Sequence, residues 1–120
     1  MKYLMMICFN EAEWEALPPT EHQRRRAEFD AYTVRMAEAG KLIDGYPLHS
    51  SRTATTLRTV NGKLEMVDGP FADTKEQFAG YFLMETKDLD EMLALAAECP
   101  GSKYCTIEVR PCAPRGGDPQ

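Results

Sequence analysis

The stretch "KYLMMICF" (residues 2–9) decides the fold, because it is apolar at both alternating sets of positions. In an extended chain, successive side chains point to opposite faces of the sheet. A strand with one buried face would alternate apolar and polar residues. Residues 2–9 are therefore predicted to form a central strand that is covered on both faces.

Two helices are predicted on either side of the middle of the chain. The first begins at Thr20, where Thr20-x-x-Gln23 forms a capping box, and ends at Gly40. Its buried stripe follows the helical spacing: Phe29, Tyr32, Thr33, Met36 and Ala37. The second helix spans residues 88–99, with Asp88 as its cap. The run Arg24 to Arg26 is interpreted as a solvated helix face, and residues 10–19 as a polar loop.

Further strands are predicted at residues 41–48, 53–60, 63–67, 79–86 and 103–111. Asn61-Gly62 joins the second and third of these, and this pair favours a type I′ hairpin turn with positive φ at both residues. The resulting order is β-α-β, a hairpin insert, then β-α-β, which is typical of a ferredoxin-like α+β sandwich. We expect one domain at residues 1–111, followed by a disordered tail at 112–120.

The two helices are expected on the same face of the sheet, because crossover connections are right-handed. The other face would then expose a large apolar patch, which soluble monomers rarely tolerate. A homodimer in which a second copy covers that face is therefore expected. Any ligand pocket would lie between the sheet and its partner.

Composition excludes several classes of function. The formal charge is −5, from 14 basic and 19 acidic residues, which argues against a nucleic-acid partner. No apolar run reaches the roughly 18 residues of a membrane span. The N-terminal apolar run meets Asn10, Glu11 and Glu13 instead of a small-residue cleavage site, so a cytoplasmic protein is expected.

The four cysteines indicate neither a metal site nor a redox pair. Cys8, Cys99, Cys105 and Cys112 show no CxxC spacing, and no histidine cluster accompanies them. Free thiols are expected, with Cys8 and Cys105 as near neighbours on antiparallel strands. No cofactor or metal is predicted.

The segment "VDGPFADTKEQFAGYF" (67–82) is dense in turn signals. Asp68 can bond the backbone two residues further on, and Pro70 fixes its own φ. Asp73-x-x-Glu76 and Thr74-x-x-Gln77 are overlapping capping boxes, which predict one helical turn before the next strand. Each feature has a structural explanation, and none requires catalysis.

This segment, continued as "LMETKDLDEMLALAAECP" and followed by "IEVRP", strongly resembles the DGPF branch of the YCII-related protein family. "MKYLMMICFNEAEW", "AEAGKLIDGYPL" and "TATTLR" extend the resemblance to the front of the chain. The resemblance implies a ferredoxin-like subunit that dimerises as an α/β barrel. Some YCII-like proteins are small-molecule hydrolases or dehalogenases with a His-Asp pair. DGPF members are often encoded beside extracytoplasmic-function sigma factors.

Three residues are candidates for catalysis. His22 resembles the helix-start histidine of the YCII-like hydrolases, with Asp44 or Asp68 as its partner; otherwise it is a solvent-exposed residue of the first turn. His49 follows a strand and either reaches a pocket or lies in a loop. Asp68 is either a turn residue or a pocket carboxylate.

Five further residues are candidate ligand contacts. Arg58 and Arg110 could hold an anion, and Phe71 could be a rigid aromatic anchor. Tyr81 could offer its hydroxyl or belong to the core. Glu108 could form an acid–base pair with Glu85 or be a rim charge.

Two functions follow from these observations. The first is a small-molecule binding protein or enzyme, with a pocket inside the dimer barrel where His22 or His49 lies near Asp68. The alternative is a non-catalytic regulatory or interaction protein that acts with an extracytoplasmic-function sigma factor. The sequence leaves open whether the protein is an enzyme.

Overall fold

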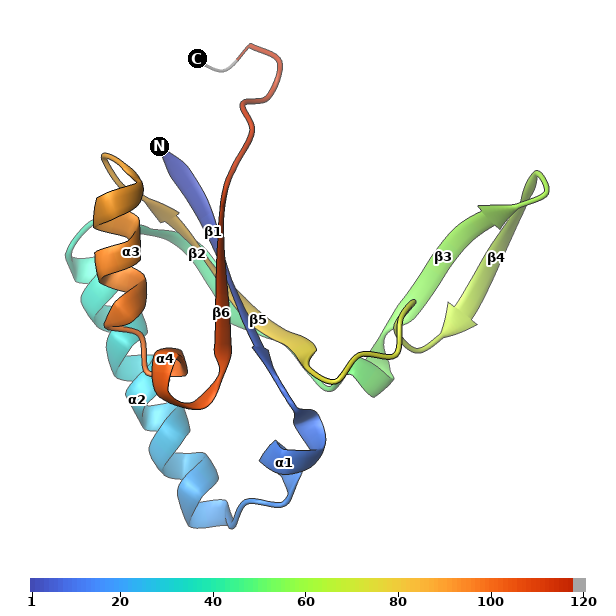
Figure 1. Ribbon diagram of the computed structural model, residues 1–120, viewed down its shortest axis with the longest axis horizontal. Coiled ribbons are helices and arrows are strands. Elements are labelled where there is room, and N and C mark those ends of the chain that lie inside the picture. Colours follow the sequence, from blue (N-terminus) through green and yellow to red (C-terminus); the bar gives the residue numbers. More distant parts are fainter. Residues whose placement is uncertain (118–120) are drawn as a thin grey trace.

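A four-stranded antiparallel sheet forms the centre of the protein (Figure 1). The structure is a computed structural model that describes residues 1–117. The sheet consists of β1 (Lys2–Phe9), β2 (Leu42–Pro47), β5 (Gln77–Glu85) and β6 (Thr106–Pro111), in the order β2-β5-β1-β6. β1 lies between β5 and β6, as the apolar pattern of residues 2–9 predicts. This is the ferredoxin-like strand order, and the mixed α+β class is confirmed.

Two helices cover one face of this sheet. In Figure 1, α2 (Pro19–Glu38) and α3 (Leu89–Ala97) both lie on the same side of the strands. Gly40 has φ +73° just beyond α2, so it terminates the helix in the left-handed conformation as expected. The Asp88 side chain accepts a hydrogen bond from the Glu91 backbone N–H at 2.9 Å, so the predicted cap of α3 is also confirmed.

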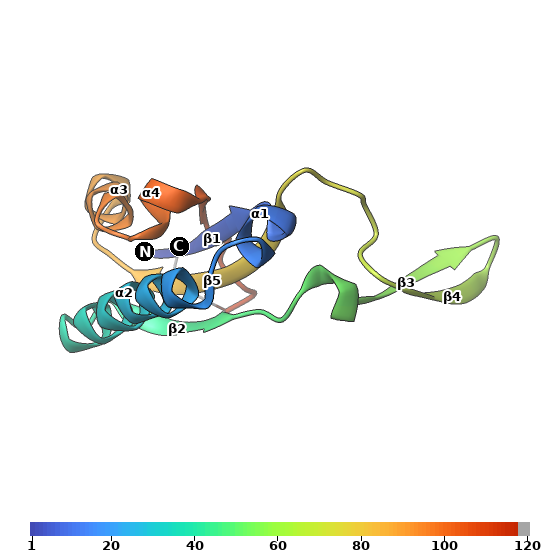
Figure 2. The ribbon, with the colours of Figure 1, turned by 90° about the horizontal axis from the view of Figure 1, so that it is seen from below.

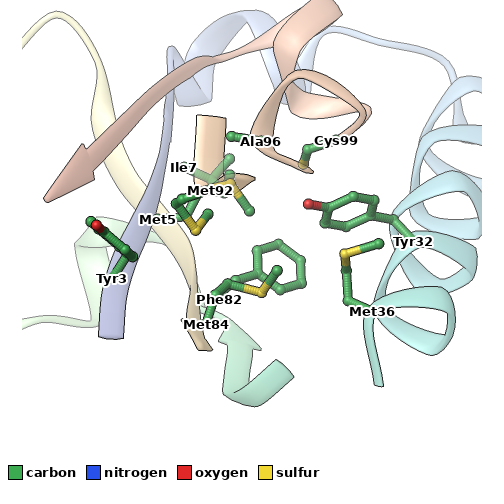
Figure 3. Packing of buried hydrophobic residues seen from close by; sticks show 10 residues of the cluster. All are labelled: Tyr3, Met5, Ile7, Tyr32, Met36, Phe82, Met84, Met92, Ala96 and Cys99. Carbon is green, nitrogen blue, oxygen red and sulfur yellow. The ribbon is translucent and has the colours of Figure 1, made fainter. Parts of the chain in front are cut away.

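The core lies between these helices and the sheet, and it is rich in methionine (Figure 3). Met5, Met84 and Met92 are each fully buried. The Tyr32 ring meets the Phe82 ring edge-on, with the centroids 5.5 Å apart. The Tyr32 hydroxyl donates to the Leu95 carbonyl oxygen at 2.7 Å, so this buried polar group is satisfied.

The opposite face of the sheet is apolar along its two central strands. We call it the open sheet face, and its central residues are Leu4, Met6, Cys8, Tyr81 and Leu83. The register places Leu4 opposite Leu83 and Met6 opposite Tyr81. All five side chains are half-buried, and Figure 1 shows α2 and α3 together on the other side of the strands.

A separate two-stranded ribbon projects from the body (Figures 1 and 2). It consists of β3 (Thr55–Val60) and β4 (Lys63–Asp68), and a short 3-10 helix, η1 (Ser51–Thr53), precedes it. Asn61 has φ +50° and Gly62 has φ +79°. The predicted hairpin with positive φ at both turn residues is therefore confirmed.

The start of the first helix differs from the prediction. Residues expected to form a loop contain α1 (Glu11–Glu15), where Asn10 accepts a hydrogen bond from the Glu13 backbone N–H at 3.0 Å. α2 begins at Pro19, and the Thr20 capping box does not form. Proline is favoured in the first helical turn because its φ is already helical and it lacks an N–H that would need a partner.

Two other local predictions are wrong. A further short helix, α4 (Gly101–Tyr104), follows α3 where a strand was expected to begin. No helical turn forms at residues 73–77, where the sequence predicted two overlapping capping boxes. The Thr74 hydroxyl instead donates to the Glu76 carbonyl at 2.6 Å, and the Gln77 amide donates to the Thr74 carbonyl at 2.6 Å. Such side-chain bonds offer the backbone an alternative to the helix.

The expected tail lies partly outside the described residues. Residues 112–117 are irregular or form a turn, and the prediction for residues 118–120 falls beyond the part of the chain that the structure describes. Within residues 1–117, no helix is both long enough and apolar enough to cross a membrane.

Candidate functional site

A cavity of about 710 Å³ lies where α1, the middle of α2 and one end of the sheet meet. Ile7, Phe9 and Phe82 line it from the side of the sheet that the helices cover. The cavity therefore lies within one chain, mainly on its helical side, where the sequence did not predict one. The predicted pocket between the sheet and a partner stays a prediction. Glu13 and Trp14 of the unforeseen α1, and residues 25–33 of α2, line its other side.

Aromatic residues make up much of the lining: Phe9, Trp14, Phe29, Phe82 and Tyr104, together with Tyr46 and Tyr81, which the strand register pairs on the open sheet face. Trp14 stacks on Phe9 with the ring centroids 5.6 Å apart. Trp14 also stacks on His22, at a centroid distance of 4.2 Å. Mainly apolar and aromatic walls with a few polar groups are typical of small-molecule sites.

Charged groups of both signs reach the cavity: Arg25, Arg26, Lys103, Glu13, Asp30 and Glu76. Arg25 donates to Glu21 at 2.8 Å, and its guanidinium lies 4.0 Å from the centre of the Tyr104 ring. Arg26 lies 5.7 Å from the Trp14 ring centre. Neither Arg26 nor Lys103 forms a salt bridge within residues 1–117, so these two cations are available to an anionic group.

His22 is held directly behind the cavity wall. Its Nε2 atom lies 2.6 Å from the Trp14 carbonyl oxygen. Because a carbonyl oxygen only accepts hydrogen bonds, Nε2 must carry the proton. In the neutral ring, Nδ1 is then the acceptor and can take up a proton.

The structure does not join His22 to either candidate aspartate within one chain. Asp44 lies in β2, where its side chain accepts a hydrogen bond from the Gly45 N–H at 2.9 Å. Asp68 is the exposed last residue of β4, on the projecting ribbon. His49 is exposed between β2 and η1. The three predicted catalytic residues thus occupy three different regions.

The predicted ligand contacts are also dispersed. Tyr81 is among the residues that line the cavity, although the register opposite Met6 places its side chain on the open sheet face. Arg58 lies on the ribbon, and Phe71 in the following loop is 78% exposed. Glu108 and Arg110 are exposed on β6, on the same side as the open sheet face. Of these five residues, only Tyr81 lies where the cavity is.

Sequence reasoning missed the α2 side of the cavity. Arg26, Phe29, Asp30 and Thr33 all line it, and their spacing is i, i+3, i+4, i+7. That spacing places them on one face of the helix. Phe29 and Thr33 were assigned to the core, and the arginines to a solvated face. The polar residues Arg26 and Asp30, beside an otherwise apolar stripe, were the feature of the sequence that could have indicated the cavity.

Cys105 also lines the cavity, and burial makes its thiol less reactive. Desolvation raises the pKa of the Cys105 thiol to about 11. A thiol with such a pKa remains protonated at neutral pH and is a poor nucleophile. Among the described residues, no group of three or more His, Cys, Asp or Glu side chains is arranged to hold a metal ion.

Comparison with known proteins places the chain in a family. Residues 1–114 match the YCII-related domain. The uncharacterised protein R00369 of Rhizobium meliloti (strain 1021) is 36% identical over 111 residues, which cover 90% of each chain.

A solved structure with a similar fold is 5-chloro-2-hydroxyhydroquinone dehydrochlorinase (TftG) from Burkholderia phenoliruptrix AC1100, in complex with 2,5-dihydroxybenzoquinone. The TM-score is 0.52 with 17% sequence identity, over 99% of this chain and 100% of the other. At this identity the likeness concerns the fold.

Proposed function

The chain belongs to the YCII-related family, and we propose that it binds or converts a small polar aromatic molecule in the cavity beside α1 and α2. The observation that carries this proposal is the cavity itself. Its volume of about 710 Å³ combines aromatic walls with two cations that have no acidic partner within residues 1–117. A planar ring suits the walls, and an ionised oxygen on that ring suits the cations.

Hydroxylated benzenes and quinones are the ligand class with this chemistry. Their rings can lie against the aromatic side chains of the lining, and their ionised hydroxyls can pair with Arg26 or Lys103. The related dehydrochlorinase was solved with 2,5-dihydroxybenzoquinone, a ring of this class. This supports 2,5-dihydroxybenzoquinone as the probe.

If the protein is catalytic, His22 is the residue we propose as its base. The Trp14 carbonyl fixes the Nε2–H tautomer, which leaves Nδ1 as the accepting nitrogen. Because His22 lies behind Trp14 and does not line the cavity, a proton from a ligand hydroxyl would reach Nδ1 through a water. Hydrolase-like or dehalogenase-like chemistry would need a carboxylate partner. Asp44 and Asp68 remain the two candidates for it, and His49 remains the alternative histidine.

Thermal denaturation with 2,5-dihydroxybenzoquinone as the probe tests the proposal. A ligand that binds only the folded protein raises the melting temperature by mass action. Arg26→Gln should weaken probe binding by at least about tenfold, roughly the effect of losing a charge-assisted contact. Arg35→Gln, on the same helix but outside the cavity lining, is the matched control and should bind normally. An equal loss of probe affinity in both variants, or no shift of the wild-type melting temperature with the probe, would show that this cavity is not the binding site.

The open sheet face supports a homodimer, which we propose as the assembly of this protein. Leu4, Met6 and Leu83 are only half-buried there, and a second copy would cover them. Such a pairing would build the dimeric α/β barrel expected from the resemblance to the DGPF branch, and we place the protein in the cytoplasm. Light scattering should give about twice the 13.5 kDa of one chain; a mass of one chain with the fold intact would contradict the dimer.

The sigma-factor function remains a prediction from the family resemblance. No contact or surface in residues 1–117 favours it over the small-molecule function. Co-purification with a sigma factor encoded nearby would be the direct measurement.

A further inference from the structure

Arg25 reaches the cavity from α2 and is held in place by two contacts. Its Nε atom donates to the Glu21 carboxylate at 2.8 Å, and its guanidinium carbon lies 4.0 Å from the centre of the Tyr104 ring. The Arg25 side chain is only 22% exposed. An arginine that is already fixed in this way loses little conformational freedom when it binds a ligand.

The two Nη atoms of Arg25 carry the hydrogen-bond donors that these contacts leave unused. Within residues 1–117, Nε is the one atom of this guanidinium that donates to a protein group. The Nη pair forms a planar fork whose spacing matches the two oxygens of a carboxylate. Arg25 therefore offers a bidentate contact, which a single ring hydroxyl cannot fill.

The acidic partner of Arg25 lies outside the cavity lining. Glu21 accepts hydrogen bonds from Arg24 as well as from Arg25, so two guanidinium groups share one carboxylate. The hydrogen bonds from Arg24 and Arg25 lower the pKa of Glu21 to about 2, so this carboxylate stays ionised at neutral pH. Of these three residues, only Arg25 lines the cavity. The cavity thus meets a positive member of the cluster.

Tyr104 is itself fixed, so it can hold Arg25 in position. The Tyr104 hydroxyl donates to the Glu28 carboxylate at 3.2 Å. A Cβ at Gly101 would come within 3.3 Å of the Phe29 ring, so α4 packs closely on α2. The Tyr104 ring is therefore a firm surface against which the Arg25 guanidinium lies.

Arg25 and Arg26 lie beside different aromatic residues of the lining. Arg26 is 5.7 Å from the centre of the Trp14 ring on α1, whereas Arg25 lies over Tyr104 on α4. The cavity thus offers cations at two positions. A ring that uses both would carry two separate oxygen groups, one of them able to fill the fork of Arg25.

We propose that the ligand of this cavity is an aromatic acid, whose carboxylate binds the Nη pair of Arg25 while a ring hydroxyl lies toward Arg26. Arg25 determines this specificity, and Tyr104 is its positioning residue. The inference rests on the proposed small-molecule function and narrows its ligand class from hydroxylated rings in general to hydroxybenzoates.

Isothermal titration calorimetry with a matched pair of probes tests the carboxylate contact. 2,5-Dihydroxybenzoate and 2,5-dihydroxybenzamide share the ring and both hydroxyls, but the amide is neutral and has a single acceptor oxygen. The wild-type protein should bind the benzoate at least about tenfold more tightly, because the amide loses the charge-assisted bidentate contact. Equal affinity for the two probes would overturn the proposal without the need for any variant.

Substitution of Arg25 assigns the preference to this residue. Arg25→Gln should reduce it to about twofold or less, while the affinity for the benzamide changes by less than about threefold. Arg25→Lys keeps the charge but not the fork, and should retain less than about a third of the wild-type preference. Arg35→Gln loses the same charge on the same helix outside the lining, and should retain all of it. An unchanged preference in either Arg25 variant would contradict the assignment.

Two variants of Tyr104 test its positioning role. Tyr104→Leu removes the ring below the guanidinium and no charged group, and should lower the preference for the benzoate at least about threefold. Tyr104→Phe keeps the ring and should keep the preference. Equal preference in Tyr104→Leu and the wild type would show that Tyr104 does not position Arg25.

The outcomes separate this inference from the proposed function. If 2,5-dihydroxybenzoquinone binds and the benzoate shows no advantage over the benzamide, only the aromatic acid is overturned. If none of the three probes binds the wild-type protein, the proposed function fails, and the aromatic acid fails with it.

Discussion

The central strands of the body and the strands of the projecting ribbon (β3 and β4, hereafter the arm) both carry large apolar side chains, but the first are buried and the second are exposed. Met5 on β1 and Met84 on β5 are fully buried, whereas Met66 on β4 is 67% exposed. Helices α2 and α3 pack on the first two residues, while nothing in residues 1–117 packs on the third. Apolar residues thus predict a need for burial, and the neighbouring elements decide whether one chain can meet it.

The largest expected difference in stability is between truncating a buried methionine of the body and truncating an exposed methionine of the arm. Met84→Ala should lower the free energy of unfolding by about 3 kcal/mol, because it removes a packed side chain and leaves a cavity. Met66→Ala should change it by less than about 0.5 kcal/mol when the protein is dilute enough to be monomeric. Urea denaturation measures both. A comparable loss in dilute Met66→Ala protein would mean that the arm packs on its own body.

Alkaline pH should destabilise the body specifically, because the arm contains no cysteine. Burial raises the pKa of Cys99 from 9.0 to about 11, and Cys99 is 1% exposed. Since the folded protein disfavours the thiolate, stability is intact below pH 9 and is lost between about pH 9 and 11. The loss from this thiol should be on the order of 2 kcal/mol.

Cys99→Ala isolates that contribution, and its stability should fall less steeply between pH 9 and 11 than that of the wild type. Thiol titration supplies the control. All four cysteines are free in the structure, so freshly prepared protein should show four thiols when denatured. In the folded protein, exposed Cys112 should react first and Cys99 last.

Two glycines distinguish global from local stability. Gly40 and Gly62 both have positive φ, and a Cβ at either position would meet no atom within 4 Å. The cost of alanine at each is therefore backbone strain alone, about 1 kcal/mol. Gly40→Ala should lower the global free energy of unfolding, because it strains the end of α2. Gly62→Ala should accelerate hydrogen exchange in β3 and β4 while leaving the global value of the monomer nearly unchanged.

The smallest effects concern the base of the arm. Glu11 of α1 accepts hydrogen bonds from the Ser51 N–H and hydroxyl, both at 2.7 Å, and so ties η1 to the body. Glu11→Ala should cost about 1 kcal/mol and increase amide exchange in η1. Arg52→Ala, which breaks the exposed contact of Arg52 with Glu15, should leave the unfolding midpoint unchanged within error. A larger loss for Arg52→Ala than for Glu11→Ala would reverse this assignment.

The sequence predicted those parts of the fold that depend on a few adjacent residues. Gly40, Asn61-Gly62 and Asp88 were identified correctly because each meets a backbone requirement at its own position. The capping boxes at Thr20 and at 73–77 failed because other local bonds competed for the same groups. Pro18 and Pro19 set the start of α2, and the Thr74 hydroxyl bonds to the Glu76 carbonyl instead.

The site was less predictable from sequence. His22 was identified from a family resemblance, and the structure places it behind Trp14, next to the cavity. Arg26 and Tyr104 were not identified, because each becomes a cavity residue only through the packing of α1, α2 and α4. The predicted roles of His49, Asp68, Arg58, Phe71, Glu108 and Arg110 remain predictions.

The sequence by itself determined that β1 is central, where the hairpin turns, and that the fold is of the mixed α+β class. These properties follow from alternation, turn chemistry and caps, which act over a few residues. Only the tertiary structure decided that the cavity lies on the helical side and that the arm stands free of its own body. Both depend on contacts between residues far apart in the chain, such as Ser51 with Glu11, and no local pattern specifies which distant surface a segment will meet.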